Sequence, residues 1–212
     1  MDALGWVYIQ RGKLDEAASV VNEGRVIAEQ YQMQDEIALA MCELGIIARA
    51  RGDYDAAQRS LEEALSIDCQ VQIKAIIHHE LGILSHYQGN LNKAEQHLQT
   101  TAEIEPIIGD MPVSDVWVDL GDIAKERKQY NKAERLYKKE LALATKIVRF
   151  VGIARAKQRL AFLNEERGNF GRALKLAQEA LEIFERLGMK KEIKETREMM
   201  ERLESQITEA RK

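Results

Sequence analysis

The sequence contains few residues that break or cross-link a chain. Its 212 residues include 2 prolines, 2 cysteines and 13 glycines, while 45% are hydrophobic and 31% are charged. All-β folds need many more turn residues, and disulfide-stapled domains need more cysteines, so both classes are excluded. Most of the remaining residues favour helices. The composition therefore predicts an all-α protein.

Long apolar runs and secretion signals are also missing. No stretch approaches 18 uninterrupted apolar residues, and no basic segment followed by an apolar core stands at the N-terminus. We therefore expect no membrane contact. Cys42 and Cys69 are too far apart for a CxxC motif, which favours a reducing, cytoplasmic location.

The charge is unevenly distributed along the chain. The net charge is −4, but residues 1–112 carry 8 basic and 18 acidic residues, and residues 113–212 carry 23 basic and 17 acidic ones. The two halves therefore have net charges of −10 and +6. An overall acidic chain is not expected to bind nucleic acid.

A leucine followed by a small residue recurs at a nearly constant interval. The pairs are Leu4-Gly5, Leu44-Gly45, Leu81-Gly82, Leu120-Gly121 and Leu160-Ala161, spaced by 40, 37, 39 and 40 residues. Each pair precedes a turn and then an alanine, and the aligned alanines are Ala17, Ala57, Ala94, Ala133 and Ala173. Such a period predicts a repeat protein in which the small residue lets two helices approach closely.

The turn inside each unit has a shared pattern as well. The five turns read RGKLDEA, RGDYDAA, QGNLNKA, RKQYNKA and RGNFGRA. The glycine supplies a positive φ, and the large apolar residue two positions later packs against the start of the next helix. Lys128 replaces the glycine in the fourth turn, so we expect strain or a different geometry there.

This pattern resembles the tetratricopeptide repeat. Trp117–Gly121 and Leu4–Tyr8 match the opening of its signature, and Gly52–Leu65 matches its second helix. The resemblance extends to about Leu187 and implies a right-handed α-solenoid of stacked antiparallel helix pairs, the TPR-like superhelix. The units are longer than the usual ~34 residues, which makes them similar to the sensor arms of STAND-type signal-transduction regulators and to kinesin light chains.

The register predicts five helix pairs in residues 1–187 and a capping helix in residues 188–212, within a single continuous domain. The expected helices are residues 2–11, 14–31, 34–51, 54–68, 71–88, 91–105, 114–128, 130–149, 151–167, 170–187 and 190–210. The last helix has one apolar stripe and is otherwise charged, as expected of a cap; a coiled-coil partner helix is the alternative.

Two places depart from the regular pattern. The expected first helix lacks its opening turn, which favours a piece of a longer protein over a gene that starts at Met1. The connection 103–115 contains Pro106 and Pro112, so one helix should end before Pro106 and the next should begin after Pro112. The charge changes sign at this connection, which is either a hinge or a plain longer loop.

Motifs for catalysis or metal binding are missing. The sequence has no phosphate-binding loop, dinucleotide fingerprint, nucleophile elbow or CxxC pair. All four histidines lie between His78 and Leu98, but Ile83 stands where a zinc-protease helix needs its second histidine. The register predicts that His78 packs inward, that His97 points outward, and that only His79 and His86 share a surface. We therefore expect no enzyme activity, no metal and no cofactor.

The resemblance implies a concave groove lined by the first helix of each pair. The groove positions are Asp2, Trp6, Ile9, Cys42, Ile46, Arg49, His79, Ile83, His86, Val118, Asp122, Lys125, Gln158, Phe162 and Glu165. An apolar floor with polar walls suits a partner peptide, an amphipathic helix or a small ligand. Alternatively, the superhelix itself or further domains cover these side chains.

A second candidate surface is a basic stripe on one face of the helix expected at residues 130–149. It consists of Lys132, Arg135, Lys139, Lys146 and Arg149, and it is either a solvated face or a docking site for an acidic partner. The sequence as a whole predicts a non-catalytic protein-interaction scaffold in a larger regulatory protein, with an unknown oligomeric state. The alternative is a sensor of a small ligand or signalling peptide in a transcription regulator or STAND NTPase.

Overall fold

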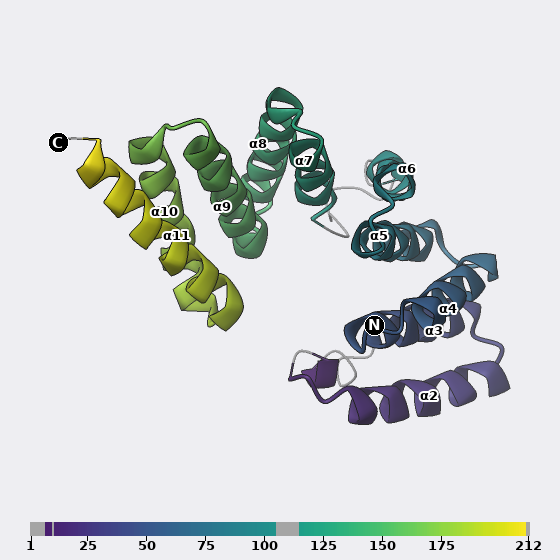
Figure 1. Cartoon of the computed structure of the whole chain (residues 1–212). Helices are drawn as coiled ribbons and strands as arrows, with labels where there is room; N and C mark the ends of the chain where they lie inside the picture. Colours follow the sequence, from purple (N-terminus) through teal and green to yellow (C-terminus); the bar gives the residue numbers. More distant parts are fainter. Residues whose placement is uncertain (1–6, 10, 105–114, 211–212) are drawn as a thin grey trace. The chain divides into compact units, whose positions relative to one another are not determined.

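The computed structural model describes residues 7–9, 11–104 and 115–210, and all regular secondary structure in these ranges is helical. The chain divides into two compact units, residues 1–114 and 115–212 (Figure 1). The prediction of an all-α fold is confirmed for the described residues. The expectation of a single continuous domain stays a prediction.

The helices of each unit follow the repeat closely. Residues 7–9 are helical, and unit 1 continues with α2 (Leu14–Gln30), α3 (Gln34–Ala50), α4 (Tyr54–Ser66), α5 (Val71–Tyr87) and α6 (Leu91–Ile104). Unit 2 contains α7 (Val116–Glu126), α8 (Tyr130–Lys146), α9 (Phe150–Glu166), α10 (Phe170–Leu187) and α11 (Lys190–Glu209). Most ends agree with the sequence within two residues. The largest difference is at α8, which ends at Lys146 and not at residue 149. Pro106 and Pro112 lie outside the described residues.

The helices pack in adjacent antiparallel pairs, as in a solenoid. We call the first helix of a pair the A helix (α3, α5, α7, α9) and the second the B helix (α2, α4, α6, α8, α10). Within a unit, a B helix packs against its own A helix and against the next one: α4 contacts α3 and α5, and α8 contacts α7 and α9. The A helices within one unit also touch, α3 with α5 and α7 with α9, and α11 packs on α10 and α9 as a further A helix would.

The turns within the pairs share one geometry. Gly12, Gly52, Gly89 and Gly168 have positive φ angles, and so does Lys128 at 59°. The residue after this position donates its backbone N–H to a carbonyl five residues earlier, as in Gln129 to Ala124 at 2.8 Å. The fourth turn therefore has the same geometry as the others, and lysine bears the strain of the left-handed region. Residues Gln32 and Val148 also have positive φ angles, at turns between pairs.

Close packing inside a pair depends on the small residue that follows the recurring leucine of the A helix. A methyl group added at Gly82 would lie 2.7 Å from Leu98 Cγ, and one at Gly45 would lie equally close to Leu61 Cγ. The aligned alanines Ala17, Ala57, Ala94, Ala133 and Ala173 are all fully buried. The predicted close approach of the two helices is therefore present in the described pairs.

Candidate partner-binding face

The predicted groove residues lie on the A helices, but not all of them reach a surface. Four are buried, with exposed fractions of 6% or less: Cys42, Ile46, Val118 and Gln158. The neighbouring helices cover these side chains, so their expected placement on an open surface is wrong. The half-buried ones are Ile9, Arg49, His79, Ile83, His86, Asp122, Lys125, Phe162 and Glu165. Trp6 and Asp2 lie outside the described residues.

In unit 1 the A-helix face is formed by α3 and α5. Arg49 of α3 donates to Glu80 of α5 at 3.0 Å, and its guanidinium lies 5.5 Å from the centre of the Tyr87 ring. His79 Nδ1 is 4.0 Å from the same glutamate. Ile83 lies one turn after Glu80 and is half-buried. This face therefore combines an ion pair that joins two A helices with an apolar side chain beside it.

In unit 2 the corresponding face joins α7 to α9. Asp122 accepts hydrogen bonds from Tyr137 Oη at 2.7 Å and from Arg159 Nε at 2.9 Å. Burial and the neighbouring Asp122 carboxylate raise the pKa of Tyr137, so its hydroxyl stays protonated and donates. Lys125 Nζ lies 5.4 Å from the centre of the Phe162 ring, a cation–π contact. Asp122, one of the predicted groove positions, therefore connects α7 to α8 and α9.

The same kind of contact continues from α9 to α11. Gln158 donates to Thr196 Oγ1 at 2.9 Å inside the packing, and Arg202 donates to Glu165 at 3.3 Å nearer the surface. These partners are 38 and 37 residues apart, close to one repeat. Side-chain contacts one repeat apart therefore hold successive A helices in register and preorganise the face between them.

The basic stripe on α8 is shorter than predicted. Arg149 lies in the turn before α9, where its guanidinium forms ion pairs with Asp115 and with Glu140, which is fully buried. It cannot belong to an outer docking surface, because a buried carboxylate needs its charge. Asp115 also pairs with Arg155, and these two arginines lower the pKa of its carboxyl group against the effect of burial.

The remaining cations of the stripe lie on α8 itself. Arg135, Lys139 and Lys146 are exposed, and Lys132 is half-buried. Lys139 Nζ lies 3.4 Å from the centre of the Trp117 ring, so one side of this lysine is engaged by the A helix of its own pair.

The histidines are arranged differently from the prediction. His78 is half-buried as expected, but His97 turns toward it, and their Nδ1 atoms lie 3.1 Å apart. The outward placement of His97 is therefore wrong, because α6 packs against α5 and brings both rings into one contact. Burial and the neighbouring ring lower the pKa of His78, and burial and Lys93 lower the pKa of His97. A neutral pair can share one proton in an N–H···N hydrogen bond.

The described residues contain no group of three or more His, Cys, Asp or Glu side chains that could hold a metal ion. Burial raises the pKa of the Cys42 thiol strongly, so this cysteine is inert packing. Every helix in the described ranges is too short or too polar to cross a bilayer.

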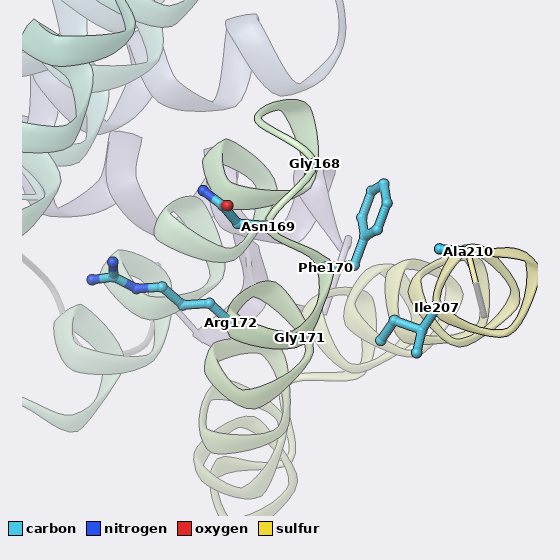
Figure 2. A pocket seen from close by; sticks show the side chains of 7 residues that line it. All are labelled: Gly168, Asn169, Phe170, Gly171, Arg172, Ile207 and Ala210. Carbon is cyan, nitrogen blue, oxygen red and sulfur yellow. The ribbon is translucent and has the colours of Figure 1, made fainter.

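One hollow lies at the end of unit 2, between the start of α10 and the end of α11. It has a volume of about 500 Å³ and is lined by the turn at Gly168 and Asn169, by Phe170 and by Ile207. Figure 2 shows Phe170 and Ile207 on its two sides, with the Arg172 side chain directed away from α11. The hollow has apolar sides and polar backbone from the turn, and sequence patterns gave no sign of it.

Comparisons with known proteins agree with the repeat geometry. Two stretches match models of the tetratricopeptide repeat, residues 37–70 and residues 112–186, which together make up just over half of the chain. The chain belongs to the tetratricopeptide repeat family. Tetratricopeptide repeats are protein-interaction scaffolds, and the fold is a non-catalytic one. A search of curated protein sequences finds no match.

Three solved structures have folds similar to this chain. BtubC (BKLC) from P. vanneervenii has a TM-score of 0.67 at 14% identity, covering 92% of each chain. The Cut9–Hcn1 hetero-tetramer of APC/C has a TM-score of 0.70 at 19% identity, over 94% of this chain and 35% of that one. A STAND protein with a tetratricopeptide repeat sensor from Pyrococcus horikoshii has a TM-score of 0.69 at 23% identity, over 80% and 26%. These similarities show the fold.

Proposed function

We propose that this chain is a non-catalytic scaffold that binds a partner peptide or helix along the face of its A helices. The observation that carries the proposal is the set of side-chain contacts between successive A helices, from Arg49–Glu80 in unit 1 to Asp122–Arg159 in unit 2. Because these contacts fix the face before binding, a partner loses less conformational freedom in the complex.

The chemistry of the face indicates what the partner offers. In unit 1, Ile83 shares one face of α5 with His79 and His86, and in unit 2 the Phe162 ring lies under the Lys125 ammonium. An apolar side chain of the partner would contact Ile83 or Phe162. Its carboxylates would face the Lys125 ammonium, and its other polar groups would face the imidazole rings. We therefore propose a peptide with one apolar anchor next to acidic residues.

The experiment uses peptides selected on the whole chain from a display library of natural protein segments. The dissociation constant of a selected peptide is measured by fluorescence polarisation for Ile83→Asp, Phe162→Asp and the unaltered chain. Gln99→Asp on α6 and Lys175→Asp on α10 are matched controls, because both residues are exposed on B helices. Thermal melts by circular dichroism check that every variant is folded.

We expect at least a tenfold loss of affinity, about 1.4 kcal/mol, in the variant of the unit that binds, and less than a twofold change in both controls. If every selected peptide binds Ile83→Asp and Phe162→Asp as tightly as the unaltered chain, the A-helix face is not the binding site. Loss of affinity in the two controls would place the site on the B helices.

A second candidate function is that of a sensor arm in a larger, cytoplasmic regulatory protein. The similarity to a STAND protein with a tetratricopeptide repeat sensor favours it. In this case a small ligand or signalling peptide stabilises the chain by mass action. A rise in melting temperature with one member of a metabolite panel, abolished by Ile83→Asp or Phe162→Asp, supports the sensor. No rise with any member counts against it.

The four remaining cations of the stripe, Lys132, Arg135, Lys139 and Lys146, are a separate proposal for docking an acidic partner. Replacing Arg135 and Lys146 with glutamate leaves the A-helix face unaltered. A selected partner whose binding weakens in this variant and with added salt uses the stripe. If this variant binds every selected partner as tightly as the unaltered chain at all salt concentrations, the stripe is not a docking site.

A further inference from the structure

Another hollow of unit 2 lies at the start of α8, beside the turn that follows α9, and has a volume of about 550 Å³. Four of the residues that line it are cationic and none is acidic, and all of them belong to unit 2. The cations are Lys128 in the turn before α8, Lys132 and Arg135 on α8, and Arg167 in the turn after α9. Two successive helix pairs therefore contribute positive charge to one hollow.

Contacts between the two pairs fix one side of the hollow. Arg167 Nη2 donates to Asn131 Oδ1 at 3.0 Å, and Nη1 of the same guanidinium forms an ion pair with Glu134. Both partners lie near the start of α8, so this arginine reaches from one pair to the other. Lys132 and Arg135 are three residues apart and therefore lie on one side of α8. The cations border the hollow from both pairs.

Two carboxylates near the hollow already have partners. Glu134 pairs with Lys138 at 2.7 Å as well as with Arg167, and these two cations lower its pKa to about 2. Glu166 accepts a hydrogen bond from Tyr130 Oη at 3.3 Å. Neither glutamate lines the hollow. An anion in the hollow would therefore meet four cations and no acidic side chain in the lining.

Lys128 is held in an unfavourable backbone conformation. Its φ is 59°, whereas glycine stands at this position in the other four turns. The left-handed region costs a residue with a side chain about 1–2 kcal/mol. The lysine side chain does not offset this cost by packing, because Lys128 is exposed. The turn therefore gives up stability at the position where a side chain adds positive charge to the hollow, and strain of this kind is common at functional sites.

The first turn of α8 adds backbone donors to these cations. The side chain of Gln129, the residue before the helix, does not cap it. At the matching positions, Asp53 and Asn90 accept hydrogen bonds from the starts of α4 and α6. Backbone N–H groups at the start of a helix favour a negative charge. An anion at α8 would take the place of the missing side-chain cap.

We propose that this hollow binds the phosphate group of a phosphorylated side chain in a partner protein. A phosphate monoester carries a charge of about −1.5 to −2 at pH 7 and has three acceptor oxygens, so it can use several cations and N–H donors at once. The partner is a protein, because the repeats of this family are protein-interaction scaffolds. The hollow is larger than a phosphate group and has room for the residues on either side of it.

This site is separate from the A-helix face of the proposed function, because α8 is a B helix. Lys132 and Arg135 also belong to the basic stripe, but Lys128 and Arg167 do not, which distinguishes the hollow from the stripe. Ile83→Asp and Phe162→Asp should leave phosphate binding unchanged. The site and the A-helix face can therefore each fail alone.

The test follows the amide chemical shifts of the ¹⁵N-labelled whole chain by NMR while the peptide acetyl-Gly-phosphoserine-Gly-amide is added. The unphosphorylated peptide and inorganic phosphate are titrated in parallel. Lys128→Gly is the test variant, because glycine is the residue of the other turns and keeps their geometry. Lys175→Ala is the matched control, because it removes an exposed cation from α10, outside the hollow.

We expect the phosphopeptide to shift the amides of residues 128–135 and 167–168, and the unphosphorylated peptide to shift none of them. Lys128→Gly should raise the melting temperature and yet weaken phosphopeptide binding about fivefold, while Lys175→Ala should change the dissociation constant less than about twofold.

The proposal is overturned if these amides do not shift, or if Lys128→Gly binds the phosphopeptide as tightly as the unaltered chain. Shifts spread evenly over the other lysines of the chain would show unspecific attraction and overturn it as well. Tighter binding of inorganic phosphate than of the phosphopeptide would replace the protein partner with a free anion.

Discussion

The close approach of the two helices in a pair makes a prediction about Gly82 and the leucine opposite it. An alanine methyl group at Gly82 would lie 2.7 Å from Leu98 Cγ and 2.8 Å from Leu98 Cδ2. Leu98 is 1% exposed and has little room to move. Overpacking of this kind costs about 1–3 kcal/mol, while alanine in a helix is favoured over glycine by about 1 kcal/mol. We expect Gly82→Ala to lower the free energy of unfolding by about 0–2 kcal/mol.

The sign of the effect should reverse when the leucine is removed. In a Leu98→Ala background the added methyl group meets space, so Gly82→Ala should raise stability by about 1 kcal/mol from helix propensity. The last pair already has this combination, with Ala161 on its A helix and Ala177 on its B helix, both fully buried. The coupling between the two substitutions should therefore reach about 1–3 kcal/mol.

Guanidinium unfolding curves of the four proteins, followed by circular dichroism at 222 nm, measure this coupling. Equal slopes of the curves indicate that the same structure unfolds in each case. If Gly82→Ala changes the unfolding free energy by the same amount in both backgrounds, the close contact does not explain why glycine stands at this position.

Three further outcomes follow from strain, buried charge and titration. Val148→Gly should raise the unfolding free energy by about 1 kcal/mol, because a β-branched residue in the left-handed region is strained. Arg149→Ala should lower it by about 3–5 kcal/mol, because the buried Glu140 loses its ion pair with Arg149. The pKa values of His78 and His97 are lower in the folded chain than in the unfolded one. The free energy of unfolding should therefore be highest above pH ~6.5 and should fall as the pH drops through the folded-state pKa values.

Thermal melts of matched variants check these outcomes. Val148→Ala keeps the positive φ without β-branching and should gain less than glycine does. Arg135→Ala, on the exposed part of α8, should stay within about 0.5 kcal/mol of the unaltered chain. Between pH 7.5 and 5, His78→Gln combined with His97→Gln should show a smaller fall in melting temperature. An unchanged fall would remove the histidine pair as its cause.

The positions of the helices could be predicted from the sequence because each pair repeats the same local signals. Glycine at the turn, alanine in the B helix and leucine followed by a small residue set the ends of helices and their contacts within a pair. Lys128 shows that the turn geometry is imposed by the packing of the pair, since the backbone is the same without glycine. The period therefore predicts more than any single residue does.

The candidate site was harder to predict. The repeat register gives the face of a helix on which a side chain lies, but it does not give the neighbouring helices that cover that face. Cys42 and Gln158 point toward the expected groove, yet the adjoining helices bury both. Arg149 was assigned to α8 by continuing its periodicity, but the left-handed Val148 ends that helix and turns the arginine toward Glu140. His97 reaches His78 only because two helices pack side by side. Contacts between helices decided each case.

Hydrogen exchange of the whole chain with and without a selected peptide tests the binding account most directly. Binding at the A-helix face should slow exchange in the A helices of one unit, α3 and α5 or α7 and α9, while the exposed faces of the B helices exchange as before. Protection confined to α4, α6, α8 or α10 would contradict the assignment of partner binding to the A-helix face.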